Sequence, residues 1–217
     1  AVAAAAIAST DPLVIVEGAA GSGKTTMLRT AITVAAEHGR VSRVVAPTKK
    51  AAQVAEEELG VPATSVAALV YAHGWRWNRD GVWTCLAVGD LDLDTGRNYT
   101  GPPKHARLHR GERVIVDEAG MLDQDTARAL LAVTAGARAT VALVGDRAQL
   151  PAVGRGGVLD MAAQIRGRTY DMTELHRFTD PGYAALTLAM RGRETPGDVF
   201  DRLVAIRLVT LHADDEH

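Results

Sequence analysis

Cysteine is almost absent from this sequence, and so is any excess of charge of one sign. The single cysteine, Cys85, excludes an internal disulfide and a zinc site built from several thiolates in a chain of 217 residues. Lysine and arginine number 24 against 26 aspartates and glutamates, for a formal net charge of −2. The chain therefore has no overall positive field to coat a polyanion, and a nucleic acid would have to bind in a local groove. A lone thiol is typical of a reducing compartment, so we expect a cytoplasmic protein.

Long hydrophobic runs are missing as well. No apolar stretch approaches the ~20 residues needed to cross a membrane, and residues 1–8 lack the basic start of a signal peptide. We therefore expect no membrane partner. At 47% hydrophobic and 23% charged residues, the composition is that of a globular chain with one or at most two domains. The missing initiator methionine predicts a segment of a longer polypeptide.

Short apolar stretches typical of buried strands alternate with longer helical stretches. The expected strands are Leu13–Val16, Val44–Ala46, Val114–Val116, Thr140–Val144 and Thr169–Met172. The expected helices are Thr25–Glu37, Lys49–Leu59, Asp123–Ala135 and Val158–Ile165. Glycines follow the first two helices, and Asp123 is a suitable N-cap for the third. This alternation predicts an α/β fold with a mainly parallel sheet between helices.

Residues 71–111 interrupt the alternation and contain all three tryptophans. Trp75 and Trp77 alternate with polar residues, an Asp80-Gly81 turn follows, and Trp83 begins a second alternating stretch. This pattern predicts a β-hairpin inserted into the α/β core. Two interpretations remain open: a surface insertion that packs its own aromatic rings, or a hairpin that separates strands or stacks on unpaired bases.

Two further charge patterns lie in this insertion. Residues 97–111 are basic and contain no acid, which is typical either of a surface for a polyanion or of an ordinary solvated face. The basic residues after Arg97 are Lys104, Arg107 and Arg110. Three aspartates alternate just before this stretch, at Asp90, Asp92 and Asp94. Their spacing lacks the glycine and the final carboxylate of a calcium-binding loop, so we predict no calcium site there.

The segment between the first expected strand and the first expected helix matches the phosphate-binding pattern G-x-x-x-x-G-K-[ST]. Its residues are Gly18, Ala19, Ala20, Gly21, Ser22, Gly23, Lys24 and Thr25. Glycines let backbone N–H groups turn toward phosphate oxygens, and the helix N-terminus adds partial positive charge. Lys24 is expected to reach the β- and γ-phosphates and Thr25 to ligate Mg²⁺, with Thr26 counted in the same site.

Two carboxylates follow the buried strand Val114–Val116, where open α/β sheets place their ligands. We expect Asp117 to hold Mg²⁺ through water and Glu118 to polarise the attacking water. A nucleotide kinase or a GTP-dependent switch shares the phosphate loop, but a hydrolytic motor needs the second carboxylate as a base.

A third strand end carries Asp146 and Gln149. We assign Asp146 to the nucleotide site. The Gln149 amide cannot act as a base, but it can bridge the attacking water and the γ-phosphate and so report on the nucleotide state.

Four segments together carry a family resemblance: Gly18–Thr25, Ala46–Ala52, Asp117–Leu122 and Gly145–Gly157. In this order they resemble superfamily 1 DNA helicases of the RecD-like branch. More closely, they resemble the helicase part of actinobacterial MobF-type conjugative relaxases, from about Val14 to Phe200. The resemblance implies a RecA-like P-loop NTPase domain that uses ATP and Mg²⁺.

The resemblance also implies roles that the residue pattern alone does not. It implies that single-stranded DNA contacts Thr48, Lys49, Thr64 and Ser65, and that Arg177 faces the γ-phosphate. Thr48 is also a suitable N-cap for the helix that starts at Lys49, and it could fill both roles. Trp75 and Trp77 would add base contacts if the hairpin is functional. The segment before Leu13 contains no glutamine, the residue with which this family recognises adenine.

These expectations describe the first motor lobe of a 5′-to-3′ single-stranded DNA helicase. The resemblance places a second RecA-like lobe and an N-terminal relaxase domain elsewhere in the same polypeptide. One alternative is a vestigial lobe that only binds DNA or a partner. Another is a small-molecule kinase, which would leave residues 46–52 and 145–157 without a role.

Overall fold

The computed structural model describes residues 1–19, 21–149, 155–166, 169–172, 189 and 196–206. Its strands are β1 Leu13–Gly18, β2 Ser42–Ala46, β3 Ala63–Ser65, β4 Trp75–Trp77, β5 Trp83–Cys85, β6 Leu91–Asp92, β7 Arg97–Asn98, β8 Arg113–Val116, β9 Thr140–Gly145 and β10 Tyr170–Met172. Its helices are α1 Val2–Ile7, α2 Lys24–Glu37, α3 Lys49–Leu59, α4 Val66–Ala72, the 3₁₀ turn η1 Ala119–Met121, α5 Gln124–Ala137, α6 Val158–Arg166 and α8 Pro196–Ala205. None of the helices in these ranges has the length and apolar character needed to span a membrane.

In the described part of the chain, six strands form one sheet in the order β10-β1-β9-β8-β2-β3. All neighbouring strands in this sheet are parallel. The α/β fold with a mainly parallel sheet is therefore confirmed. The carboxyl ends of β1, β8 and β9, which precede the three predicted motifs, lie at one edge of the sheet.

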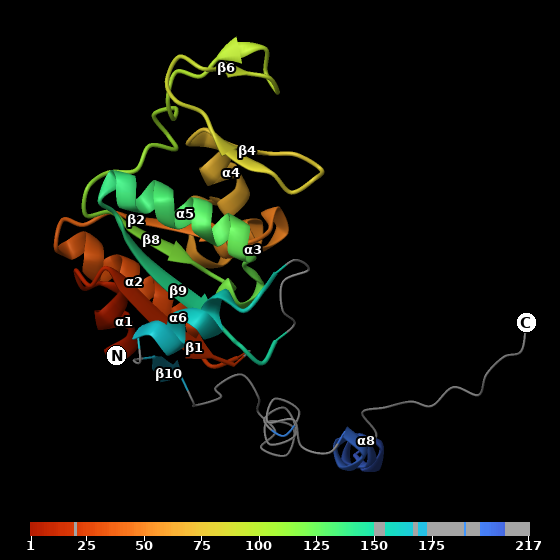
Figure 1. Ribbon diagram of the computed structural model, residues 1–217. Coiled ribbons are helices and arrows are strands. Elements are labelled where there is room, and N and C mark those ends of the chain that lie inside the picture. Colours follow the sequence, from red (N-terminus) through yellow and green to blue (C-terminus); the bar gives the residue numbers. More distant parts are fainter. Residues whose placement is uncertain (20, 150–154, 167–168, 173–188, 190–195, 207–217) are drawn as a thin grey trace, which may run out of the picture.

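Alternate residues of β1 supply the hydrophobic cores on opposite faces of the sheet. Val14 and Val16 pack with α1 and α2 on one face, whereas Ile15 packs with α4, α5 and α6 on the other. Figure 1 shows α4 and α5 together on one side of the sheet and α1 and α2 on the other. The alanine-rich residues 1–8 therefore contribute a structural helix, in which Ile7 is fully buried.

The insertion forms two small antiparallel hairpins outside the main sheet (Figure 1). In the first hairpin Trp77 lies opposite Trp83, as the alternating pattern predicted. The Asn78 side chain accepts hydrogen bonds from the N–H groups of Asp80 and Val82, which holds the connecting turn. The β-hairpin in this insertion is therefore confirmed, and the second hairpin, β6–β7, follows it.

Candidate nucleotide-binding site

The loop between β1 and α2 has the backbone geometry of an anion cradle. Gly21 and Gly23 have φ angles of 81° and 83°, in the left-handed region that favours glycine. A Cβ at Gly18 would lie 2.5 Å from the Ser22 hydroxyl oxygen, so a larger residue would force the Ser22 side chain to move. Gly23 is also the N-cap of α2 and makes no side-chain cap, which leaves the first N–H groups of this helix available to a ligand.

The surroundings of Lys24 and Ser22 suit a bound phosphate. The Lys24 ammonium donates a hydrogen bond to the Gly18 carbonyl oxygen at 2.9 Å, across the mouth of the loop. The Ser22 hydroxyl is buried and has no hydrogen-bond partner among the described residues. A bound phosphate would supply acceptors for both groups, so the loop fits the nucleotide that its sequence predicts.

A pocket of about 790 Å³ opens beside this loop and gathers most of the predicted site. The predicted residues that line it are Gly21, Gly23, Lys24, Thr25, Thr26, Thr48, Asp117, Glu118 and Gln149. They come from four segments that are far apart in the sequence. Lys50 and Ala51, from the resemblance segment 46–52, also line the pocket. So do four residues that the sequence did not single out as site residues: Arg29, Val54, Ala55 and Glu58. Its volume lies in the range of small-molecule and cofactor sites.

The two carboxylates at the end of β8 differ in environment. Burial, and secondly the negative charge of Glu118, raise the pKa of Asp117 from 3.8 to about 6, although Lys24 opposes this shift. The Asp117 Oδ1 accepts the Glu118 N–H at 3.0 Å. Asp117 and the Thr25 hydroxyl are oxygen donors of the type that Mg²⁺ prefers, and both line the pocket, so these residues fit a magnesium ion.

Close backbone packing holds the carboxylates beside Gln149. A Cβ at Gly120 would lie 2.7 Å from the Asp146 carbonyl oxygen, and a Cβ at Gly145 would lie 2.9 Å from the Gly120 nitrogen. The segments that follow β8 and β9 can therefore touch only because both positions are glycine. Asp146 is 4% exposed, and its carboxylate accepts the Ala148 N–H at 2.9 Å. Asp146 does not line the pocket; its contact shapes the turn that leads to Gln149.

An ion-pair network attaches the same turn to the phosphate-loop strand. Arg147 donates from Nε to the carboxylate of Glu17 at 2.7 Å and from Nη1 to Asp160 at 3.0 Å. Glu17 is 8% exposed and lies at the end of β1, next to the loop. Neither partner of Arg147 was singled out from the sequence, because an isolated charge in a loop does not reveal its partner.

A contact between α2 and α3 was also missed. The Thr25 hydroxyl donates to the Glu58 carboxylate at 2.8 Å, and the Arg29 guanidinium donates from Nε to the Glu58 carbonyl oxygen at 2.8 Å. Glu58 is the last of three consecutive glutamates, a pattern typical of a solvated helix face. Only the packing of α3 against α2 places it at Thr25.

The four residues predicted from the motif resemblance to contact DNA lie at or just after the carboxyl ends of the neighbouring strands β2 and β3. Thr48 is the N-cap of α3 and accepts the Ala51 N–H at 3.1 Å, so its capping role is confirmed, and it also lines the nucleotide pocket. Lys49 is exposed beside it. Thr64 and Ser65 end the edge strand β3, where Ser65 caps α4. Their contact with DNA stays a prediction, and Arg177 and Ala20 lie outside the described residues.

The tryptophans of the hairpin pack mainly on protein. Trp75 and Trp83 are half-buried against the main hydrophobic core, and Trp77 stacks on Trp83 with ring centroids 4.7 Å apart. Trp77 also meets the Tyr71 ring edge-on and keeps 42% of its surface exposed. All three rings therefore pack on other aromatic rings, as the self-packing interpretation expects, and Trp77 is the most exposed of the three, while contact with a base stays a prediction.

Arg76 holds the second hairpin against the first. Its guanidinium lies 3.5 Å above the Tyr71 ring and donates to both carboxylate oxygens of Asp92, at 3.1 and 2.7 Å. This arginine lowers the pKa of Asp92 to about 2. Asp92, the middle one of the three alternating aspartates, therefore has a structural role as the partner of Arg76.

Comparison with known proteins identifies one family. A family model described as "AAA domain" matches residues 1–213. Among solved structures, the chain is similar to the arterivirus nonstructural protein 10 helicase in complex with DNA, with 19% identity and a TM-score of 0.44 over 87% of this chain and 42% of that one. It is also similar to the PRRSV helicase, with 17% identity and a TM-score of 0.39 over 79% of this chain and 32% of that one. The chain spans less than half the length of either helicase.

Proposed function

This chain belongs to the AAA domain family, and we propose that it is the ATP-binding first motor lobe of a DNA helicase. Its six-stranded parallel sheet is consistent with a RecA-like P-loop NTPase domain. In this proposal ATP hydrolysis with Mg²⁺ drives 5′-to-3′ movement on single-stranded DNA. One observation carries it. A single pocket holds the phosphate-loop Lys24, both carboxylates of the β8 end, Gln149 and the α3 cap Thr48.

The contacts of the pocket suggest a division of roles. Gly21, Gly23 and Lys24 would hold the phosphates through backbone N–H groups and an ammonium. Thr25 and Asp117 would hold Mg²⁺, which when bound neutralises charge on the phosphate oxygens. The ion would also keep Asp117 ionised despite its burial.

Glu118 and Gln149, the other two predicted catalytic side chains in the pocket, would act differently on the attacking water. Glu118 is placed to accept a proton from an attacking water, as a carboxylate can. Gln149 can orient that water but cannot take its proton. Arg177 would add positive charge at the γ-phosphate, as the motif resemblance implies.

The placement of Thr48 supports coupling between nucleotide and DNA. Thr48 and the exposed Lys49 start α3, directly after β2, while Thr64 and Ser65 end the neighbouring strand β3. Hydroxyl and ammonium groups hold phosphates without reading bases, which suits a motor that moves along any sequence. Because Thr48 also lines the nucleotide pocket, occupancy of the pocket can shift this grip.

The wider setting follows from the motif resemblance. It suggests the helicase region of a conjugative relaxase, with a second motor lobe and a relaxase domain in the same polypeptide. We therefore expect residues 1–217 alone to bind Mg-nucleotide weakly and to hydrolyse it slowly, because the resemblance assigns part of the ATP site to the second lobe.

The test measures nucleotide binding and turnover by this chain, with and without single-stranded DNA. Wild-type protein should bind Mg-ATP, and Lys24→Ala should abolish binding because the ammonium is lost from the cradle. DNA-stimulated turnover by these 217 residues at ~1–10³ s⁻¹, as in complete enzymes, would contradict the half-site proposal. Equal nucleotide binding by wild type and Lys24→Ala would overturn the nucleotide site itself.

A further inference from the structure

The hydrogen bond between Thr25 and Glu58 determines how the Thr25 hydroxyl can meet a metal ion. A threonine hydroxyl has one proton to donate and two lone pairs to offer. Thr25 donates its proton to the Glu58 carboxylate at 2.8 Å. Within the described part of the chain no donor occupies the lone pairs of Oγ1, and Thr25 and Asp117 line the same pocket.

Glu58 is held in place by a second contact from the same helix as Thr25. The Arg29 guanidinium donates to the backbone carbonyl of Glu58, which is one of the last carbonyls of α3. Arg29 lies four residues after Thr25, so both side chains emerge from one face of α2. Arg29 thereby ties the backbone of Glu58 to α2, and the Glu58 carboxylate accepts the Thr25 hydroxyl on the same helix.

We propose that Glu58 is a positioning residue for the magnesium–nucleotide complex. It accepts the Thr25 proton and so keeps the oxygen lone pairs of Thr25 available to Mg²⁺. This inference rests on the proposed ATP-binding function and adds to it a residue from α3, the helix that begins at the Thr48 cap. If Glu58 were absent, the hydroxyl would be free to rotate and to donate its proton to another acceptor, and its ligation would lose orientation.

The experiment compares nucleotide affinity of the full chain in Mg²⁺ and in EDTA. The ratio of the two dissociation constants measures what the metal adds. Glu58→Leu removes the acceptor in a residue that favours helices, and we expect the ratio to fall by about three- to tenfold, the size of one hydrogen bond. Affinity in EDTA should stay within about twofold of wild type. Glu58→Gln keeps an acceptor oxygen and should retain most of the ratio.

Glu57 supplies matched controls on the same helix. It accepts a hydrogen bond from Gln53 and does not line the pocket, so Glu57→Leu and Glu57→Gln should leave the ratio unchanged. Circular dichroism and thermal melting of every variant establish that the fold is kept. A double variant with Thr25→Val should show no further loss from Glu58→Leu, because the hydroxyl to be positioned is gone.

Several results would overturn this inference. Equal losses for Glu58→Gln and Glu58→Leu would assign the effect to charge, and equal losses in EDTA and Mg²⁺ would assign it to structure. A rise in the ratio would make Glu58 a competitor of the metal. If wild type binds nucleotide, Lys24→Ala does not and Glu58→Leu keeps the full ratio, only the role of Glu58 is refuted. If wild type binds nucleotide in neither buffer, the proposed function fails and this inference fails with it.

Discussion

Glu118 has a backbone conformation that a glycine would adopt more easily. Its φ is 54°, and Glu118 and Arg138 are the non-glycine residues with positive φ in the described part of the chain. Such a conformation costs about 1–2 kcal/mol in an L-residue. Two residues later Gly120 lies close to the Asp146 backbone, and Glu118 lines the pocket directly after Asp117. Strain retained for a carboxylate beside a phosphate loop favours a chemical role for this side chain.

The first prediction separates Glu118 from Gln149 by their chemistry. In a protein that contains both motor lobes, Gln149→Ala should leave Mg-ATP affinity within a few-fold, because the phosphate loop supplies most ground-state contacts. It should slow DNA-stimulated hydrolysis by ~10-fold, or ~1.4 kcal/mol of barrier. Glu118→Gln should cost more, about 10²–10⁴-fold, since it removes a base. Steady-state ATPase assays with single-stranded DNA measure both, and wild-type turnover by Gln149→Ala would refute its place at the γ-phosphate.

The second prediction concerns the pH dependence of stability at Asp117. Its pKa is raised from 3.8 to about 6, so between these values the folded chain binds more protons at this group than the unfolded chain does. The contribution of this group to stability therefore falls as pH rises from about 4 to 6, and the full penalty is present above 6. Asp117→Asn should stabilise the nucleotide-free protein at pH 7, by at most about 3 kcal/mol, and have little effect near pH 4.

Denaturant unfolding of wild type and Asp117→Asn at both pH values measures this difference. Asp125→Asn is a control that removes a charge from the first turn of α5, outside the pocket. A stabilisation by Asp117→Asn that is as large at pH 4 as at pH 7 would contradict the raised pKa. The expected result would mean that the magnesium site is built at a cost to the folded state, which a bound cation offsets.

At the scale of elements, the sequence predicted the strands and helices that have clear apolar patterns. The apolar runs predicted the strands β1, β2, β8, β9 and β10 of the main sheet. Sequence motifs located the phosphate loop and the two carboxylates. The edge strand β3 was missed because Ala63–Ser65 is short and partly polar, and α1 because alanines alone show no periodicity. Glu58 could not be found because its partner Thr25 is 33 residues away, on another helix.

The third prediction distinguishes the two interpretations of the tryptophan hairpin ring by ring. Trp75→Ala and Trp83→Ala remove rings packed on the hydrophobic core and should destabilise the protein by about 2–4 kcal/mol, with Trp83 also losing its stack on Trp77. Trp77→Ala removes a more exposed ring and should cost less. If Trp77 stacks on a base, its loss should weaken single-stranded DNA binding by about 1–3 kcal/mol.

Thermal unfolding and oligonucleotide binding, measured on the same three variants, separate packing from stacking. The two-lobed protein also allows translocation and unwinding to be compared. If all three variants are less stable than wild type but bind and unwind DNA as wild type does, the hairpin has a packing role. Loss of DNA affinity in Trp77→Ala, with stability near wild type, would instead support a stacking platform.

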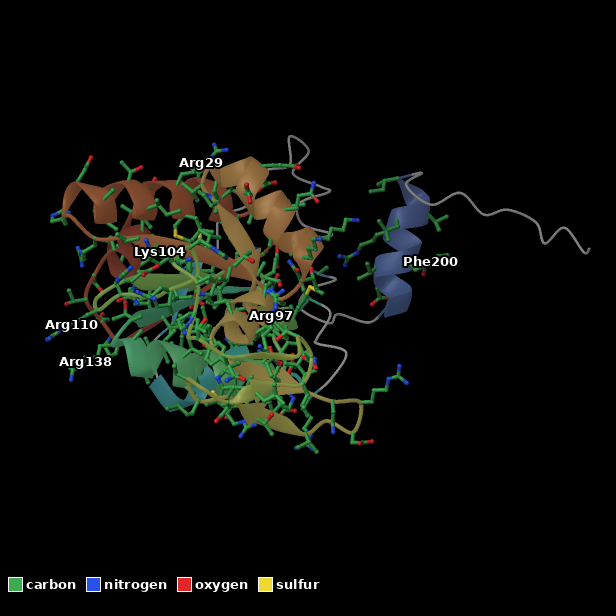
Figure 2. The ribbon with its side chains drawn as sticks, turned by 90° about the horizontal axis from the view of Figure 1, so that it is seen from above. Arg29, Arg97, Lys104, Arg110, Arg138 and Phe200 are labelled. Atoms are coloured by element: carbon green, nitrogen blue, oxygen red, sulfur yellow. The ribbon has the colours of Figure 1, made fainter. Side chains whose placement is uncertain are left out.

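At the scale of the whole molecule, DNA could bind at either of two surfaces: the one around Lys49 or the one formed by the basic stretch 97–111. Lys49 follows the carboxyl end of β2, beside the nucleotide pocket. Residues 105–107 of the basic stretch lie near the amino end of that strand, where Arg43 donates to the carbonyl oxygens of His105 and Arg107, whereas Arg97 belongs to the second hairpin. Arg110 and Arg138 lie at the same end of the molecule (Figure 2), where the N–H of Gly111, the residue after Arg110, donates to the Arg138 carbonyl oxygen. Lys49 and residues 105–111 of the basic stretch therefore lie at opposite ends of the parallel strands.

The fourth prediction uses salt dependence to choose between these surfaces. Because the formal net charge is −2, general attraction to a polyanion is absent and the slope of log K against log salt reports local phosphate contacts. For a single strand each neutralised phosphate adds about 0.7 to the slope. Lys49→Ala should reduce the slope by about this amount, while Lys104→Ala should leave it unchanged. Fluorescence anisotropy with a single-stranded oligonucleotide over a range of salt concentrations measures both, and a reduced slope for Lys104→Ala alone would move the DNA path to the basic stretch and away from the nucleotide pocket.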